Sequence, residues 1–125
     1  MTAVIERWPA APSSIVPTHG DWQPRNWLVH HGRVSVIDFG RADLRPAHTD
    51  FGRLAVQQFR GRSDLEAAFL DGYGADPRDS GAWLRLLISD AVATAVWAHQ
   101  VGDEPYEQQG HRMIAETLEA VAQTF

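Results

Sequence analysis

Two residue types are missing from this 125-residue sequence, and each absence excludes a kind of chemistry. Without cysteine, the chain cannot form disulfides, use a thiolate nucleophile or bind zinc through sulfur. Without lysine, it has no side-chain ammonium group, and all 11 of its basic residues are arginine. An arginine-only composition is typical of a GC-rich genome, so it does not by itself indicate a special need for guanidinium groups.

Excess positive charge and long hydrophobic runs are also lacking. The net charge of −5 argues against nucleic acid as a partner, because the phosphate backbone binds basic surfaces. The longest apolar stretch, residues 91–98, is interrupted by Thr94 and is too short to span a bilayer. The first residues include Glu6 and Arg7 and no apolar run of signal-peptide length. We therefore expect a cytoplasmic protein with no membrane partner.

The first third of the chain has the composition of short strands and turns. Residues 1–13, with Pro9 and Pro12, are expected to form a loose lead-in, followed by one domain over residues 14–125. Short runs at residues 14–18, 26–30 and 33–37 are of β type, and His31-Gly32 between the last two predicts a tight hairpin turn.

Helical periodicity begins near residue 47. Four helices are expected. The first covers residues 50–59. The second opens with the capping-box pattern Ser63-Asp64-Leu65-Glu66 and is closed by Gly72 and Gly74, and the last two cover residues 83–101 and 111–125. Residues 83–101 are apolar on nearly every face, which is typical of the buried centre of a helical domain. The sequence therefore predicts an α+β, mostly helical fold, in which a small β-hairpin region packs on a bundle of about four helices.

Three oxygen-bearing side chains are spaced so that one loop and one hairpin can bring them together. Asp21 and Asn26 lie five residues apart on a predicted loop, and Asp38 ends the second hairpin strand. Phosphoryl transfer needs a carboxylate that accepts the proton of the attacking hydroxyl, and oxygen ligands that hold Mg²⁺ against the phosphates. Asp21 is therefore the candidate catalytic base, and Asn26 and Asp38 are the candidate Mg²⁺ ligands.

An alternative interpretation makes Asp21 and Asn26 turn residues and Asp38 a strand-ending cap. Either motif alone, HxDxxxxN or Asp-Phe-Gly, is weak evidence because short patterns occur by chance. The two motifs in this order, each beside a predicted strand and before a helical region, favour the catalytic interpretation.

Residues 18–54 resemble the catalytic half of the aminoglycoside phosphotransferase and choline kinase-like family, and a weaker similarity continues to the C-terminus. These proteins are small-molecule kinases with a protein-kinase-like fold. The matching residues are His19, Gly20, Asp21 and Asn26 in the pattern HGDxxxxN, Ile37, Asp38 and Phe39 in the strand-ending element, and Pro46 and Asp50 in the following P-x-x-x-D. The resemblance implies that Asp50 braces the helix beneath the catalytic loop and that His19 orients the loop by hydrogen bonding.

The same resemblance implies Mg²⁺-dependent transfer of the γ-phosphate of ATP to a hydroxyl of a small molecule, such as an aminoglycoside or an amino alcohol. Two features favour a small-molecule kinase over a protein kinase. Gly20 stands where protein kinases place an arginine, and only 11 residues separate Asp38 from Asp50, too few for a peptide-docking activation segment. The acceptor itself is not readable from the sequence.

Several residues near the motifs have two interpretations. Arg25 occupies a loop position where the family often has glycine; it could reach a phosphate or lie on the solvated rim of the loop, and we expect the rim. Trp22 and Trp27 could stack on a substrate ring, but we expect them to anchor the loop in the core. The charged residues Arg41, Asp43 and Arg45 could touch the substrate, but we expect them to form a solvated loop.

The kinase template also contains a glycine-rich loop and a lysine that grip the phosphates, and this chain has neither before His19. We therefore expect the nucleotide-binding lobe to be absent from the chain. Arginine is not an equivalent substitute for an ammonium group. The uncovered cleft would favour a partner chain carrying that lobe, or self-association. The alternative function is a non-catalytic remnant or binding module that retains the fold of the catalytic lobe.

Overall fold

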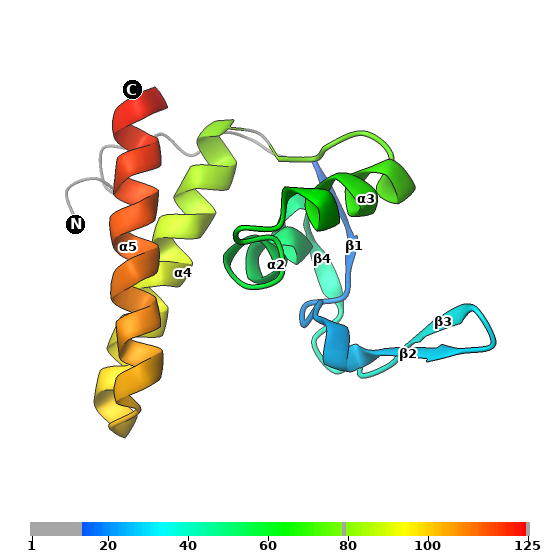
Figure 1. Ribbon diagram of the computed structural model, residues 1–125, viewed down its shortest axis with the longest axis horizontal. Helices are drawn as coiled ribbons and strands as arrows, with labels where there is room; N and C mark the ends of the chain where they lie inside the picture. The colour runs from blue at the N-terminus through cyan, green and yellow to red at the C-terminus, as the bar shows by residue number, and fades with distance from the viewer. Residues whose placement is uncertain (1–13, 79, 125) are drawn as a thin grey trace. The chain divides into compact units, whose positions relative to one another are not determined.

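The computed structural model describes residues 14–78 and 80–124, which belong to two compact units that divide after Arg78. The first unit contains four short strands and two short α-helices, and the second is a pair of long helices (Figure 1). The predicted α+β, mostly helical class is confirmed. The expected lead-in over residues 1–13 lies outside the described residues.

Two antiparallel strand pairs form the framework of the first unit. Strand β2 (Trp27–His30) pairs with β3 (Arg33–Val36), which confirms the predicted hairpin. His31 and Gly32 at its turn have φ values of 49° and 73°, as a tight turn with two left-handed residues requires. Figure 1 shows this hairpin projecting from the rest of the unit.

The second pair joins β1 (Ile15–Thr18) to β4 (Asp43–Pro46), with Thr18 opposite Asp43. The prediction of a solvated loop was therefore wrong for Asp43 and Arg45, which lie in β4, whereas Arg41 lies in an exposed turn before it. Arg45 donates hydrogen bonds to the Thr18 hydroxyl and to the carbonyl of Arg41, both at 2.9 Å. The strand forms through its backbone ladder with β1, although Asp43 belongs to a residue type that is depleted in strands.

Short helical segments follow each strand pair. The 3-10 turn η1 (Pro24–Asn26) leads into β2, and η2 (Ala47–Phe51) continues into α2 (Gly52–Val56). Helix α3 (Ser63–Tyr73) ends at Gly74, as predicted, with φ 108°. The predicted capping box was wrong, because Ser63 is already helical and the cap residue, Arg62, makes no side-chain cap bond.

Aromatic and aliphatic side chains from η2, α2 and α3 form the core of the first unit. Phe51 and Leu54 are each only 1% exposed, and Phe59 is 8% exposed. The ring of Phe69 on α3 lies 5.4 Å from that of Phe51 and 5.7 Å from that of Phe59, within the range of favourable aromatic pairs. This core lies next to the segment that carries Asp50, so it fixes that residue in space.

Arg78 closes the end of the first unit through a dense ion-pair network. Its guanidinium donates to both carboxylate oxygens of Asp76, at 2.9 and 2.8 Å, and to Glu66 on α3, at 2.6 Å. It also lies over the ring of Phe51, 5.7 Å from the centroid. The acidic residues of this network thus have structural partners.

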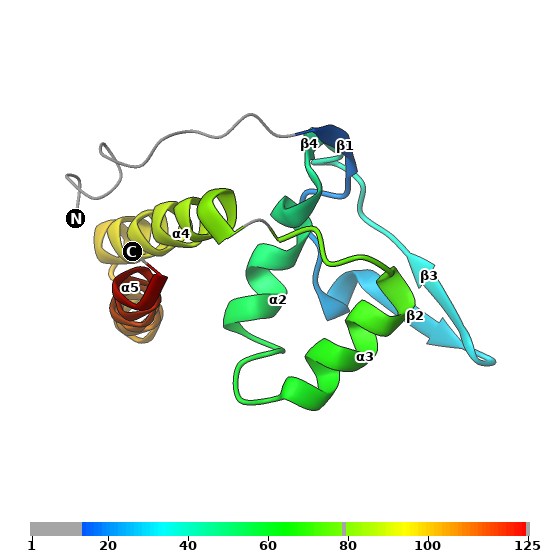
Figure 2. The same ribbon diagram turned by 90° about the horizontal axis from the view of Figure 1, so that it is seen from above.

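The second unit consists of α4 (Ser80–Val101) and α5 (Glu104–Thr124), which lie side by side in both ribbon views (Figures 1 and 2). Helix α5 begins before the predicted residue 111. The buried residues of α4 recur at spacings of four and three, as in a coiled-coil seam, and they are Leu84, Ile88, Ala91, Ala95 and Ala98.

Close packing at this seam depends on Gly110 of α5. A Cβ atom at Gly110 would lie 2.6 Å from the backbone nitrogen of Ala95, so the two helices approach too closely for any side chain there. The remaining apolar side chains of α4 lie outside the seam, where Val96, Trp97 and Val101 are more than half exposed. The expected burial of nearly every face of α4 is therefore not found within this unit.

Residues Gly81–Val101 of α4 are long enough and apolar enough to cross a membrane, judged by length and mean hydropathy alone. The earlier expectation considered only uninterrupted apolar residues, whereas a whole helix tolerates isolated polar ones. The core helix of a soluble protein passes the same test.

Candidate active site

The loop after β1 is held in place by the carboxylate of Asp50. One carboxylate oxygen accepts the backbone N–H of His19 at 2.8 Å, and the other accepts that of Gly20 at 3.0 Å. Asp50 therefore satisfies two consecutive backbone donors at the start of the loop, and bonds of this kind to a charged acceptor are stronger than neutral ones. The loop is anchored before its reactive residues begin.

The His19 side chain links the loop to the end of β3. Its Nδ1 accepts the backbone N–H of Asp21 at 3.1 Å, and its Nε2 lies 2.8 Å from the carbonyl oxygen of Ile37. A backbone N–H can only donate and a carbonyl can only accept, so the ring is the neutral tautomer that carries its proton on Nε2. With both nitrogens engaged and the residue 6% exposed, His19 positions the loop and is not available to transfer protons.

Gly20 is required by both conformation and space. Its φ of 89° is in the region that favours glycine, and a Cβ atom there would clash with the backbone of Arg41. The loop can therefore pass close to the segment before β4 only because this residue has no side chain.

Asp21 and Asn26 are in direct contact. The Asn26 amide nitrogen donates to the backbone carbonyl of Asp21 at 2.8 Å and lies 3.2 Å from its Oδ2. Asn26 is 4% exposed, so these bonds fix a buried amide whose nitrogen is engaged and whose oxygen accepts no hydrogen bond from the described residues. The predicted convergence of these two residues is confirmed by this geometry.

The other oxygen of Asp21 is positioned by a residue that sequence reasoning did not assign. Gln23 donates from its amide to Asp21 Oδ1 at 2.7 Å, and its own carbonyl oxygen accepts from Arg53 at 2.7 Å. Arg53 lies three residues after Asp50 on the same helical segment, so one face of that segment braces the loop at both ends. That spacing was the signal in the sequence that could have identified Arg53.

Asp21 is charged at neutral pH. Burial by itself raises the pKa of Asp21, but the hydrogen bond from Asn26 and the nearby charges of Arg53 and Arg25 together outweigh it and hold the pKa below its ordinary value. The Asp21 side chain is 14% exposed, so its carboxylate can still be reached by a ligand. An ionised, accessible carboxylate of this kind can accept a hydrogen bond from a hydroxyl group.

Asp38 is placed next to this cluster by the backbone. The N–H of Ile37 donates to the carbonyl of Asn26 at 3.0 Å, which extends the β2–β3 pairing up to the residue before Asp38. Asp38 has a φ of 63°, an uncommon value for a residue other than glycine. Among the described residues, its exposed carboxylate makes no hydrogen bond or ion pair, so no hydrogen bond joins it to Asn26.

The local arrangement thus contains an oriented carboxylate, a buried amide and a free carboxylate at the end of a hairpin. The model of the phosphotransferase enzyme family matches residues 1–88, which is more than half of the chain and includes all of these groups. The chain belongs to the phosphotransferase enzyme family. No curated protein and no solved structure matches it. Membership supports a kinase-like phosphotransferase at the level of the family, whose members generally use ATP with Mg²⁺.

The donor set fits the magnesium of a phosphotransferase. Mg²⁺ prefers oxygen ligands and is usually held by one or two protein groups together with substrate phosphates. Asn26 offers an amide oxygen, and Asp38 offers a carboxylate that no other described group occupies. Residues 14–78 and 80–124 contain no group of three or more His, Cys, Asp or Glu side chains that could hold a metal.

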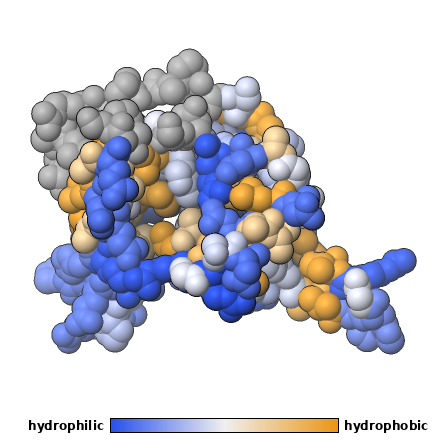
Figure 3. Space-filling model, turned by 45° about the horizontal axis from the view of Figure 1, so that its top comes forward, coloured by the Kyte–Doolittle hydropathy of each residue, from blue (hydrophilic) through white to orange (hydrophobic). Residues whose placement is uncertain are grey.

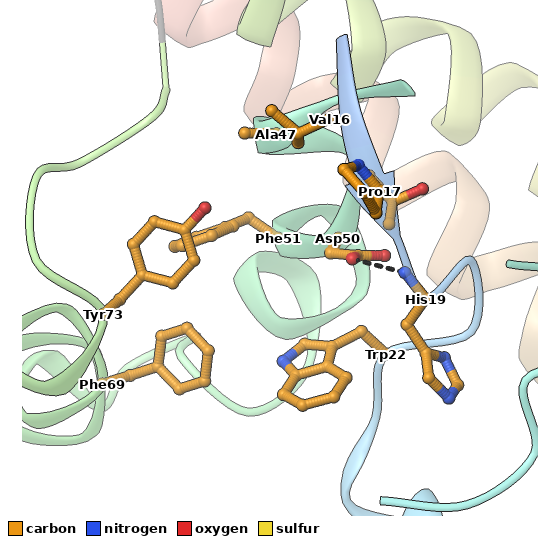
Figure 4. A pocket seen from close by; sticks show the side chains of 10 residues that line it. Val16, Pro17, His19, Trp22, Ala47, Asp50, Phe51, Phe69 and Tyr73 are labelled. Carbon is orange, nitrogen blue, oxygen red and sulfur yellow. Dashed lines mark hydrogen bonds between the residues drawn. The ribbon is translucent and has the colours of Figure 1, made fainter. Parts of the chain in front are cut away.

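A pocket of about 380 Å³ lies behind the loop in the first unit (Figure 4). Figure 4 shows the aromatic rings of Trp22, Phe69 and Tyr73 around it, and Asp50 bonded to the backbone of His19. Asp21, Asn26 and Asp38 do not line this pocket. The pocket therefore lies against the residues that support the loop, His19, Trp22 and Asp50 among them.

The tryptophans of the loop support it from this side, as predicted. The ring of Trp22 lies 5.0 Å from that of Trp27 and 5.6 Å from that of His19, and Trp27 stacks on Phe69 at 6.4 Å. These contacts join the loop to the aromatic core through α3.

Proposed function

We propose that this chain is the catalytic lobe of a small-molecule kinase that transfers the γ-phosphate of ATP to a hydroxyl group. The observation that carries the proposal is the contact between Asp21 and Asn26 on a loop whose backbone is fixed by Asp50 and His19. Phosphoryl transfer asks a protein mainly to position groups and to stabilise charge, so a rigid loop with these side chains meets its main demand.

Asp21 would accept the hydrogen bond of the acceptor hydroxyl and take its proton as the oxygen attacks phosphorus. Gln23 and Asn26 hold the two carboxylate oxygens, so the base has one orientation before the substrate arrives. Asn26 and Asp38 would hold the Mg²⁺ that accompanies ATP. When bound, that ion supplies charge neutralisation and orientation of the phosphates.

In the kinase template a glycine-rich loop covers the phosphates and a lysine grips them, and this sequence contains no lysine. We propose that a separate lobe or a second copy of the chain packs on the β2–β3 hairpin. Its support is the exposure of apolar side chains on both faces of the hairpin: Leu28 is 51% exposed, and its neighbour Val29 is 72% exposed. Val34, which pairs with Val29, is 61% exposed.

Hydrophobic atoms are visible on this hairpin in the space-filling view (Figure 3). An isolated two-stranded hairpin is only marginally stable in water, so a covering partner would stabilise it as well as complete the site.

The experiment is Mg²⁺-dependent ATP turnover by the full chain, with a panel of amino alcohols, sugars and aminoglycosides as acceptors. It is run alone and with candidate nucleotide-lobe proteins. We expect Asp21→Asn to lower the rate by about 10²- to 10⁴-fold, the usual contribution of a general base. Wild-type chain that shows no turnover in any combination, or an Asp21→Asn variant that keeps full turnover, would reject the proposal in favour of a non-catalytic binding module.

A further inference from the structure

Two arginines near Asp21 make only long contacts with its carboxylate. Arg62 and Arg78, by comparison, donate hydrogen bonds of 2.6–2.9 Å to the carboxylates with which they pair. Arg25 reaches Asp21 Oδ2 only at 3.5 Å, and Arg53 reaches Asp21 Oδ1 only at 3.8 Å. Each of these guanidinium groups therefore keeps N–H donors that Asp21 does not use.

The two side chains come from different elements and approach Asp21 from its two oxygens. Arg25 stands on η1 with 71% of its side chain exposed, and Arg53 stands on α2 with 41% exposed. Gln23 holds one end of the Arg53 guanidinium at 2.7 Å, which leaves its other donors free for a ligand. With one carboxylate and two guanidinium groups, the immediate charge of this cluster is positive.

We propose that Arg25 and Arg53 form an anion-binding pair that takes the oxygens of the phosphoryl group as it is transferred beside Asp21. The inference rests on the proposed function, because it places the phosphoryl group next to the base. Guanidinium groups suit this role through their several donors in one plane, which match the oxygens of a phosphate. Arg25 was expected on the solvated rim of the loop, and its exposure is what makes it available here.

The pair would act most strongly as the reaction proceeds. The acceptor's proton moves to Asp21 while its oxygen bonds to phosphorus, and the bond from phosphorus to the leaving diphosphate oxygen breaks. Asp21 then no longer offers a negative charge to Arg25 and Arg53, whereas the phosphoryl oxygens do. Interactions that strengthen in this way between ground state and transition state are those that raise the rate.

A consequence concerns the class of acceptor. Arg25 and Arg53 place positive charge beside both carboxylate oxygens of Asp21. This charge repels a cationic group of the acceptor that lies next to the reacting hydroxyl. The carboxylate of Asp38 is used by Mg²⁺ under the proposed function, and Asp64 and Glu66 are paired with Arg62 and Arg78. The pair therefore favours an acceptor that is neutral or anionic near its reacting hydroxyl over a polycation.

The test is titration of the full chain with tripolyphosphate in metal-free buffer, followed calorimetrically. We expect Arg25→Gln and Arg53→Gln each to weaken binding about fivefold, the effect of one partly exposed charge at about 4 Å, and the double variant about 25-fold. Arg53→Lys keeps the charge and is expected to lose less than Arg53→Gln. Arg33→Gln on the exposed hairpin is the matched control, with a change below about twofold.

Wild-type chain that does not bind tripolyphosphate, glutamine variants that bind it as well as the wild type, or an Arg33→Gln loss equal to that of Arg25→Gln would each overturn the proposal. The Asp21→Asn variant separates this outcome from failure of the proposed function. It should bind tripolyphosphate more tightly, because a repelling charge is gone, yet lose Mg²⁺-dependent transfer. Retained transfer in Asp21→Asn would reject the catalytic role of Asp21 whatever the arginine variants show.

Discussion

Substitution of Asp50 by asparagine tests how the catalytic loop is held. The carboxylate of Asp50 accepts the N–H groups of His19 and Gly20 at 2.8 and 3.0 Å. An asparagine keeps one acceptor oxygen but turns an NH2 group toward the second N–H, so one charge-assisted bond is lost and a donor faces a donor. A hydrogen bond to a charged group contributes about 1.5–3 kcal/mol, so we expect the loop to lose about 2–3 kcal/mol.

That loss is measured as amide hydrogen exchange at His19 and Gly20. If these amides exchange by local opening of the loop, about 2–3 kcal/mol corresponds to exchange about 30- to 160-fold faster than in the wild type. The matched control is Asp71→Asn on α3, whose exposed carboxylate has no partner among the described residues. Exchange at both amides within about threefold of the wild type in Asp50→Asn would refute the bracing role.

Two further predictions concern packing and pH. Gly110→Ala should lower the free energy of unfolding of the α4–α5 pair by about 1–2 kcal/mol in denaturant titrations, because a Cβ there would lie 2.6 Å from backbone. Gly72→Ala in α3 meets nothing within 4 Å and should instead stabilise by about 0.5–1 kcal/mol, so equal effects would contradict the packing account. The hydrogen bond from Arg78 lowers the pKa of Asp76, although partial burial opposes this shift. The ionised Asp76 therefore stabilises the fold above its ordinary pKa, and this contribution is lost as pH falls through the lowered pKa. Between about pH 5 and pH 2, the free energy of unfolding should therefore fall less in Asp76→Asn than in the wild type.

The sequence predicted those parts of the fold whose signals are local. The β2–β3 hairpin follows from His31-Gly32 between two β-type runs, and α4 follows from its length and apolar content. Strand β4 was missed because Asp43 and Arg45 give it no β-type composition, and its partner lies in β1, more than 20 residues earlier. Only the folded pairing makes this segment a strand.

The start of α5 was missed for a different reason. Gly110 weakens the helical pattern of its first two turns, although Asp103 and Pro105 are residues typical of a helix start. The Asp103 side chain accepts the N–H of Tyr106 at 3.1 Å, as an N-cap does. The glycine that obscured the helix in sequence is the residue that lets α5 pack against α4.

The candidate site was predictable as a set of residues but not as a network. The motif spacing predicted that Asp21 and Asn26 meet, and the structure gives that contact at 2.8 and 3.2 Å. The link from Asp21 through Gln23 to Arg53 depends on side-chain directions across a loop and a helix, which no local pattern specifies. The roles of Asp21, Asn26 and Asp38 in catalysis stay predictions.

The most direct test of the central claim is binding of Mg·ATP to the full chain, alone and with candidate nucleotide-lobe proteins, measured by calorimetry for the wild type and Asp38→Asn. We predict that binding requires Mg²⁺ and is weakened at least tenfold in Asp38→Asn, because this exposed carboxylate is the proposed charged ligand of the ion. Binding that is undetectable in every combination, or that is the same in Asp38→Asn as in the wild type, would contradict a phosphotransfer site at this loop.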